Sequence, residues 1–407
     1  MINVIGLGYI GLPTALMFAK SGIEVIGTDL KKDLVDSLSQ GKLTFVEKGL
    51  EELFAEALSN GIKFTTEYQK TGIYIIAVPT PFENFSKKIN PEYVISAVNT
   101  VLDTCEKGAM LIIESTMPPG SIDRYIRPEI QKRGLVPGED VNLAHAPERI
   151  IPGNMLYELE HNSRTIGVDD PGVGEKVKEL YARFCKSEIV ITDIRSAEMC
   201  KIVENTYRDV NIAFANELAK ICRATGMDVY EIIRIANKHP RVNILQPGPG
   251  VGGHCISVDP WFLVGDYPDL TNLILTARKI NDSMPTHVLS RIRDIMREHN
   301  INDISKIGLY GLAYKENVDD TRESPTLQLL KRMDEHLAFG VKVYDPLIKT
   351  RIVKHQFMNF EDFLNEIEIL VIMTAHDHIK NNMGLIKGKL ILDTKNICNF
   401  NDRVYKL

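Results

Sequence analysis

The sequence predicts an α/β fold in which two doubly wound sheets are joined by a long central helix. Short β-rich runs alternate with helical apolar spacing near the start of the chain, and the same alternation returns after Asp303. Between these regions, residues 196–224 keep helical spacing without Pro or Gly, which indicates one helix of about eight turns. The 407 residues also exceed the ~250–300 at which one core usually stops growing. Two Rossmann-like domains are therefore expected.

These elements predict three domains. A first Rossmann-like domain is expected at residues 1–193, a central helical domain at 194–295 and a second Rossmann-like domain at 296–407. The apolar residues of the long helix exceed what two flanking domains can cover, so we expect a homodimer or higher homo-oligomer built on it.

Composition excludes several classes of partner. The net charge of −6 and the dispersed lysines give no sign of a nucleic-acid or anionic-membrane partner. No apolar run approaches the ~20 residues that span a bilayer, and the run at residues 2–7 lacks the basic leader of a signal peptide. The six cysteines contain no C-x-x-C pair, which favours reduced thiols over disulfides or a zinc site. We expect a cytoplasmic protein without a metal.

The first element is a strand at residues 2–7, which runs into a glycine-rich turn and then a helix at 12–21. The second strand, at 24–28, ends at Asp29, near the ~20-residue offset of a carboxylate that binds a ribose 2′-hydroxyl. This context predicts NAD, since the carboxylate would repel the 2′-phosphate of NADP; the alternative is a tight turn in a plain α/β unit. The predicted cofactor-binding residues here are Gly6, Gly8, Tyr9, Ile10, Gly11 and Asp29.

The next three strands, expected at residues 73–78, 109–113 and 141–144, are each followed by polar residues. Ligands of a doubly wound sheet lie beyond the carboxyl ends of its strands, so Thr80 and Thr116 are predicted to face the cofactor. For Thr80, a helix N-cap is an equal alternative. The third strand brings Glu148 and Arg149 to the same rim.

Cys255 lies in a glycine-rich segment that ends at Asp259. A thiolate can capture an aldehyde while a nicotinamide removes hydride, so a cysteine beside an NAD site suggests oxidation of an alcohol past the aldehyde to the acid. His254 could act as a base, but neighbours in an extended loop point opposite ways, which favours a structural or cofactor-facing role.

Lys201 and Asn205 are four residues apart on the long helix and therefore share a face. Both side chains can donate to a developing oxyanion. By spacing alone, a solvated lysine with a polar neighbour is the better interpretation, because such pairs occur on most helices.

The second α/β unit repeats the order of the first. Strands are expected at residues 306–310, 341–345 and 367–374, with a helix near 326–336, and Asp345 ends its strand as Asp29 does. The glycine pattern of this unit is incomplete. It therefore favours a nucleotide other than a second NAD, bound through Tyr314, Lys315 and Arg322.

Five segments together resemble the UDP-glucose/GDP-mannose dehydrogenase family along the whole chain: residues 6–11, 147–149, 198–205, 252–255 and 319–325. Two longer runs, at residues 208–217 and 239–248, are similar to the branch of the family that acts on UDP-N-acetyl-mannosamine. Runs of that length are far more specific than a spaced glycine pattern.

The resemblance implies a role for each matching residue. Cys255 would be the nucleophile of a four-electron, two-NAD oxidation of a sugar C6 alcohol, and Lys201 and Asn205 would stabilise oxyanions. Asp259 and Thr116 would manage a water and the proton of the first oxidation, and Glu148 would assist the acyl-enzyme steps. Arg241 would reach the substrate of a neighbouring subunit. The residues that it assigns to binding the UDP-amino-sugar are Arg149, Lys201, Asn205, Arg241, Gly252, Tyr314, Lys315 and Arg322.

One departure bears on the substrate. Val258 precedes Asp259 where the UDP-glucose members have a lysine, and the 2-acetamido branches share the valine. UDP-N-acetylglucosamine and UDP-glucose dehydrogenases stay open as alternatives. Two other classes do as well: a two-electron β-hydroxyacid dehydrogenase, which would need no Cys255, and a non-catalytic NAD-sensing or scaffold protein.

Overall fold

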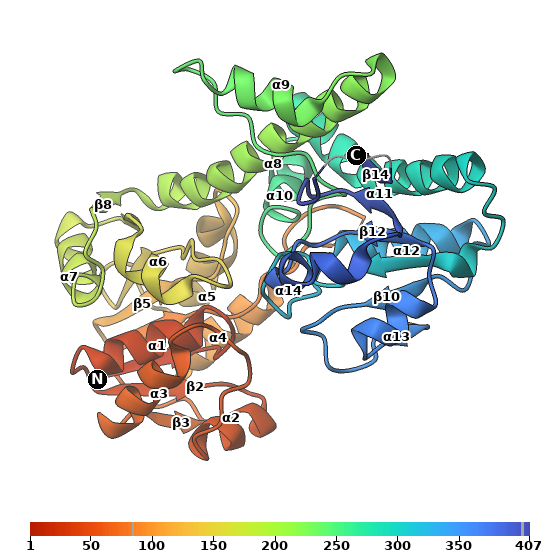
Figure 1. Ribbon diagram of the computed structural model, residues 1–407. Coiled ribbons are helices and arrows are strands. Elements are labelled where there is room, and N and C mark those ends of the chain that lie inside the picture. Colours follow the sequence, from red (N-terminus) through yellow and green to blue (C-terminus); the bar gives the residue numbers. More distant parts are fainter. Residues whose placement is uncertain (84, 400–402) are drawn as a thin grey trace. The chain divides into compact units, whose positions relative to one another are not determined.

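The computed structural model describes residues 1–83, 85–399 and 403–407, and the chain divides into two compact units, Met1–Glu204 and Asn205–Leu407 (Figure 1). The division falls within one helix, α8 (Ile194–Thr225). No helix among the described residues is long and apolar enough to cross a membrane.

Unit 1 is built on an eight-stranded sheet. Its strands, in spatial order, are β3 (Lys63–Thr65), β2 (Val25–Thr28), β1 (Ile2–Ile5), β4 (Ile73–Ile76), β5 (Ala109–Ile113), β6 (Val141–His145), β7 (Arg164–Val168) and β8 (Ile189–Thr192). All neighbours are parallel except β6 and β7. Strands β1 and β5 are buried along their whole length, as expected of a parallel sheet covered on both faces.

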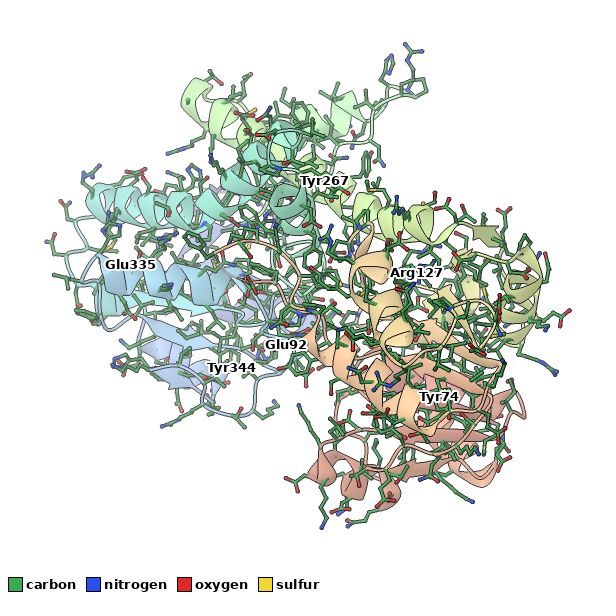
Figure 2. All side chains as sticks on the ribbon, turned by 180° about the vertical axis from the view of Figure 1, so that it is seen from behind. Tyr74, Glu92, Arg127, Tyr267, Glu335 and Tyr344 are labelled. Carbon is green, nitrogen blue, oxygen red and sulfur yellow. The ribbon has the colours of Figure 1, made fainter. Side chains whose placement is uncertain are left out.

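The helices of unit 1 connect these strands. They are α1 (Gly11–Lys20), α2 (Lys32–Ser39), α3 (Leu50–Ser59), α4 (Glu92–Thr104), the π-helical η1 (Ile122–Ile126), α5 (Arg127–Lys132), α6 (Met155–His161) and α7 (Pro171–Tyr181). Helix α1 is buried at nine of its ten positions and packs in the core with strands β1 and β2. Tyr74 of β4 is fully buried, and its hydroxyl accepts the Thr71 N–H at 2.9 Å (Figure 2).

Unit 2 combines helices with a six-stranded, all-parallel sheet. The strands, in spatial order, are β11 (Gln356–Phe357), β10 (Lys342–Tyr344), β9 (Ile307–Tyr310), β12 (Ile369–Ile372), β13 (Leu390–Asp393) and β14 (Val404–Lys406). Its helices after α8 are α9 (Val229–Ala236), α10 (Asp259–Asp266), α11 (Asn272–Glu298), η2 (Ile304–Lys306), α12 (Pro325–Glu335), α13 (Phe360–Asn365), α14 (Asp377–Asn381) and η3 (Met383–Ile386).

The predicted α/β fold class is confirmed, and element bounds differ by a few residues. Helix α8 begins two residues before the predicted Ser196 and ends one residue after Ala224. Lys306, predicted to begin a strand, instead ends η2, where Asp303 accepts the N–H of Ser305. The three-domain division at residues 193 and 295 stays a proposal.

Candidate active site

The glycine turn of unit 1 is shaped for close approach of a ligand to its backbone. Gly6 has φ of +90°, and a Cβ there would lie 2.8 Å from the Ala77 carbonyl oxygen. A Cβ on Gly11 would lie 1.9 Å from the Gly6 oxygen, whereas a Cβ on Gly8 would meet nothing within 4 Å. The turn therefore requires glycine at positions 6 and 11. At position 8, the space beside the backbone is open. This is the arrangement that a dinucleotide pyrophosphate needs.

Asp29 stands at the end of β2 as predicted. Its Oδ2 accepts the Leu7 N–H and its Oδ1 the Lys31 N–H, both at 2.9 Å. A carboxylate has about four acceptor positions, so two remain for a ribose diol. Tyr9 of the turn contacts Phe45, with ring centroids 4.4 Å apart. The residues present therefore fit NAD.

The two threonines lie on loops after their strands. Thr80 is 5% exposed, and no helix begins beside it, because the next helix begins at Glu92. The N-cap alternative for Thr80 is therefore wrong. Thr116 is partly exposed and precedes η1 by six residues, so it caps no helix either.

Glu148 belongs to a buried charge network that the sequence did not reveal. Its carboxylate pairs with Arg164 of β7, and the two side chains are 5% and 4% exposed. Arg164 also donates to Glu114 at 3.1 Å, and the Tyr181 hydroxyl donates to the same Glu114 oxygen at 3.1 Å. One guanidinium therefore serves two carboxylates.

The network perturbs the protonation of Glu114. Burial raises the pKa of Glu114 from its ordinary value of 4.5 to about 7, Arg164 opposes this rise, and the charge of Glu148 adds to it. The second oxygen, Oε2, has no hydrogen-bond partner among the described residues, as suits a neutral carboxyl group. Glu148 is thus held beside a positive charge, with a neighbour that readily carries a proton.

Arg149 is engaged by its own unit. It pairs with Glu204 of α8 and donates to the Ser163 hydroxyl at 3.1 Å. A substrate would therefore meet an arginine whose position is already restrained.

Lys201 and Asn205 are not on a solvated face. They are 4% and 2% exposed, against the interpretation that spacing alone favoured. Asn205 Nδ2 donates to Asp259 Oδ2 at 2.6 Å, while Arg208 donates to Asn205 Oδ1. Arg208 thereby fixes which end of the amide faces Asp259, since only the nitrogen can donate to a carboxylate. Asp259 itself is 3% exposed.

Cys255 begins a helical turn that leads into α10. Its carbonyl accepts the N–H of Val258 at 3.1 Å and that of Asp259 at 2.8 Å. The segment around His254 is therefore coiled, and the argument from an extended loop that placed His254 opposite the thiol is wrong. Cys255 is partly buried.

The Cys255 segment rests on the loop that follows β9. A Cβ on Gly252 would lie 2.7 Å from both the Tyr314 Cβ and the Glu323 oxygen. Gly253, with φ of +85°, donates its N–H to the Arg322 oxygen at 3.0 Å. Asp320, which the sequence did not single out, pairs with Arg322 at 2.6 Å. Two predicted groups, the cysteine segment and the UDP-binding residues, are thus adjacent in unit 2.

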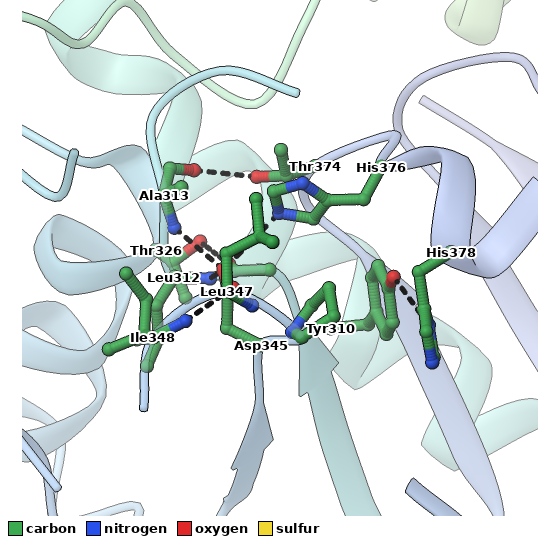
Figure 3. Close-up of polar contacts among 12 residues, drawn as sticks. Tyr310, Leu312, Ala313, Thr326, Asp345, Leu347, Ile348, Thr374, His376 and His378 are labelled. Carbon is green, nitrogen blue, oxygen red and sulfur yellow. Dashed lines mark hydrogen bonds and ion pairs between the residues drawn. The ribbon is translucent and has the colours of Figure 1, made fainter. Parts of the chain in front are cut away.

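The second glycine turn is occupied by the protein itself (Figure 3). Asp345, the counterpart of Asp29, accepts the N–H groups of Leu312 and Ala313 at 2.6 and 2.9 Å, and its other oxygen accepts those of Leu347 and Ile348. Burial raises the pKa of Asp345, but bonds from His376 and these amides outweigh it, and the net pKa is lowered. An aspartate so fully bonded cannot hold a ribose, which agrees with the expectation of a different nucleotide here.

Arg241 lies on the exposed loop after α9, and its N–H donates to His239 Nδ1 at 3.3 Å. Of the predicted residues, unit 1 contains Thr116, Glu148, Arg149 and Lys201, and unit 2 contains Asn205, Arg241, Gly252, Cys255, Asp259, Tyr314, Lys315 and Arg322. Within unit 2 the structure joins Asn205 to Asp259 directly. No group of three potential metal ligands occurs among the described residues.

Comparisons with known proteins show the family of the chain. Three models of the UDP-glucose/GDP-mannose dehydrogenase family match in order: the NAD binding domain at residues 1–185, the central domain at 195–283 and the UDP binding domain at 308–400. A UDP-N-acetyl-D-mannosamine dehydrogenase of Methanocaldococcus jannaschii is 44% identical over 98% of this chain and 92% of its own length.

Two further relatives extend the comparison. An NDP-N-acetyl-D-galactosaminuronic acid dehydrogenase of Ralstonia nicotianae is 40% identical over 97% of this chain and 95% of its own length. The solved UDP-N-acetyl-mannosamine dehydrogenase of Staphylococcus aureus superposes with a TM-score of 0.89 at 40% identity, covering 100% of this chain and 97% of that one. The protein is an NAD-dependent oxidoreductase that acts on a UDP-sugar, and the chain belongs to the UDP-glucose/GDP-mannose dehydrogenase family.

Proposed function

We propose that the protein oxidises the C6 alcohol of UDP-N-acetyl-D-mannosamine to the carboxylate, in two oxidations that pass through a covalent bond to Cys255. The observation that carries this proposal is the Asn205–Asp259 hydrogen bond of 2.6 Å, placed one helical turn after Cys255. It brings the amide of Asn205, on α8, against the carboxylate of Asp259, which begins α10 four residues after Cys255.

The first oxidation needs a proton acceptor for the C6 hydroxyl. Asp259, held by Asn205, and Thr116 are the proposed residues that order a water to take this proton. Lys201 is the proposed cation for the alkoxide, because a buried ammonium stabilises a developing negative charge strongly. NAD, when bound, accepts a hydride in each of the two oxidations.

The second oxidation uses the thiol. The deprotonated Cys255 sulfur adds to the C6 aldehyde carbon, and the resulting oxyanion is stabilised by Lys201 and Asn205. Loss of hydride leaves a thioester. Water then adds, the C–S bond breaks, and the carboxylate and the thiolate are released. Glu148, beside Arg164, is the proposed assistant of this hydrolysis. One sugar thus consumes one water and two NAD.

A panel of UDP-sugars with NADH counting and product identification tests the proposal. We expect UDP-N-acetyl-mannosamine to give two NADH per sugar and the highest kcat/KM. UDP-N-acetylglucosamine should follow by roughly tenfold to a hundredfold, because a misplaced acetamido group loses about 1–3 kcal/mol, and UDP-glucose should be poorer still. Turnover of UDP-glucose at an equal or higher kcat/KM would overturn the substrate assignment but not the reaction type.

A second candidate is a UDP-sugar of the N-acetyl-galactosamine series. The 40% identity with the Ralstonia nicotianae dehydrogenase over nearly the whole chain supports it. The same panel decides, since the two sugars differ at C2 and C4. A preference for the galacto substrate over the manno substrate would favour this second candidate.

We also propose a homodimer. Unit 2 exposes large apolar side chains on one helix at intervals of seven: Tyr207, Phe214 and Ile221 of α8 are 60%, 50% and 50% exposed. Exposed apolar stripes of this kind commonly mark interfaces. Light scattering should give twice the mass of 45.8 kDa, and a single-chain mass at working concentration would contradict the proposal.

A further inference from the structure

Residues 314–322 form a loop that we call the substrate loop, because the proposed function assigns its Tyr314, Lys315 and Arg322 to the UDP-sugar. The middle of this loop is anchored at Asn317, which has φ of +59°. Asn317 Nδ2 donates to Asp377 Oδ2 at 2.8 Å, and its Oδ1 accepts the Asp377 N–H at 3.0 Å. The Asn317 side chain is therefore bonded at both ends to the start of α14.

The backbone of the same residue is held by His376. The Asn317 N–H donates to His376 Nδ1 at 2.9 Å. Because Nδ1 is the acceptor, the ring proton lies on Nε2, which faces Asp345 Oδ2 at 3.3 Å (Figure 3). His376 is 1% exposed, so its ring is shielded from water. Asp345 is fixed in turn by four backbone N–H groups.

The two ends of the substrate loop are tied as well. The Thr374 hydroxyl donates to the Ala313 oxygen at 2.7 Å, just before the loop, and the Tyr314 N–H donates to the Asp320 oxygen at 3.0 Å. At the far end of the loop, the backbone carbonyl oxygen of Arg322 accepts the N–H of Gly253, in the Cys255 segment. The anchor at Asn317 therefore adds a further attachment between these two ends of the loop.

We propose that His376 is a positioning residue for the UDP end of the substrate. It does not touch the UDP-sugar; through the Asn317 N–H it holds the substrate loop in the conformation that presents Tyr314 and Lys315. The inference rests on the proposed function, because it needs a UDP ligand at this loop.

The physical reason is pre-organisation. A loop that is already ordered loses little conformational entropy when the ligand binds. If the loop spends only part of the time in the conformation that binds the ligand, the measured affinity falls in proportion to that population. Without an acceptor at the Nδ1 position, the Asn317 N–H, which is partly buried, would lose this bond in the binding conformation. Other loop conformations would then gain in population.

Calorimetric titration of the full-length protein with UDP alone tests the proposal without turnover. His376→Leu removes the acceptor and should weaken UDP binding by up to roughly tenfold, as expected for the loss of one partly buried hydrogen bond. His376→Asn keeps an oxygen near the Nδ1 position and should bind within about twofold of the native protein. His378→Gln is the matched control, since His378 lies two residues after His376, in α14, but bonds to the Tyr310 hydroxyl at 3.1 Å and not to the loop.

The outcomes distinguish a failure of the proposed function from a failure of the positioning role of His376. If the native protein does not bind UDP, the proposed function fails. If it does, and His376→Leu binds equally well, the positioning role is overturned. In turnover, the loss should fall on the KM for the UDP-sugar, with kcat nearly unchanged, and His376→Asn should restore it; a uniform loss in all three variants would also overturn it.

If His376→Leu does not fold, a second variant tests whether fixing the loop at Asn317 controls UDP binding, which the role of His376 requires. Asn317→Gly keeps a residue that tolerates positive φ and removes only the two bonds to Asp377. It should also weaken UDP binding severalfold. Unchanged affinity in this variant would show that the anchor does not control the loop.

Discussion

At the scale of single residues, the predicted site residues are oriented by partners that were not themselves predicted to belong to the site. Arg208 fixes the orientation of the Asn205 amide that donates to Asp259, and Glu148 pairs with Arg164, 16 residues later in the chain. Neither Arg208 nor Arg164 was predicted as a site residue. The functional residues could be proposed from the sequence, whereas the side chains that orient them could not.

Replacing the thiol tests the covalent step. Cys255→Ala should lower uronate formation by a factor on the order of 10³ or more, because no other group at this position can form the thioester. Cys105→Ala is the control, since Cys105 lies at the end of α4. Product is measured by NADH release and by mass. Two NADH per sugar at the native rate in Cys255→Ala would show that the covalent mechanism is wrong.

The raised pKa of the buried Glu114 carboxyl predicts how the stability of the fold depends on pH. Its pKa is raised by burial from 4.5 to about 7, so the folded state binds a proton that the unfolded state has released. This contribution stabilises the fold at low pH and is lost as the pH rises from 4.5 to about 7. Glu114→Gln cannot ionise. The melting temperature of Glu114→Gln minus that of the native protein should therefore increase from pH about 5 to about 8, as measured by calorimetry. A difference that stays constant or falls across this range would contradict the assignment.

At the scale of elements, the Cys255 segment is shaped by glycines at contacts and not by its own secondary structure. Gly252 is needed because a Cβ would meet Tyr314 and the Glu323 oxygen at 2.7 Å. Gly248, four residues earlier, has nothing closer than 3.9 Å. The two glycines look alike in the sequence, and only the packing distinguishes them.

This difference gives a matched pair of variants. Gly252→Ala should lower kcat/KM by more than roughly tenfold, because the backbone must move away from the substrate loop and carry Cys255 with it. Gly248→Ala should stay within about twofold of the native value. Steady-state kinetics with the preferred UDP-sugar measures both. If both substitutions changed kcat/KM equally, the contact between Gly252 and Tyr314 would have no specific effect on activity.

At the scale of the whole molecule, the sequence predicted what local patterns encode. The α/β class, the long helix, the glycine turn of NAD and Asp29 at the end of β2 follow from spacing between near neighbours. The network of Glu114, Glu148, Arg164 and Tyr181 does not, because its members come from different elements separated by up to 67 residues. The same holds for the burial of Lys201, which helical spacing alone made improbable.

The assembly prediction concerns Arg241, which lies on an exposed loop and is proposed to act on the substrate of the partner subunit. Arg241→Ala and Cys255→Ala homodimers should each be inactive. In a hybrid dimer, one site has Cys255 from one subunit and Arg241 from the other, and is intact. Half of the dimers in an equal, fully exchanged mixture are hybrids with one working site of two, so activity should recover to about a quarter of the native value.

Exchange must be verified, for example with two differently tagged chains that co-purify after mixing. A mixture of native protein with Cys255→Ala serves as the control for mixing losses, since each native subunit keeps its thiol. If exchange is complete and the two inactive variants recover no activity, Arg241 acts within its own subunit or not at all. The exposed stripe of α8 would then still describe a dimer, but one whose two sites are independent.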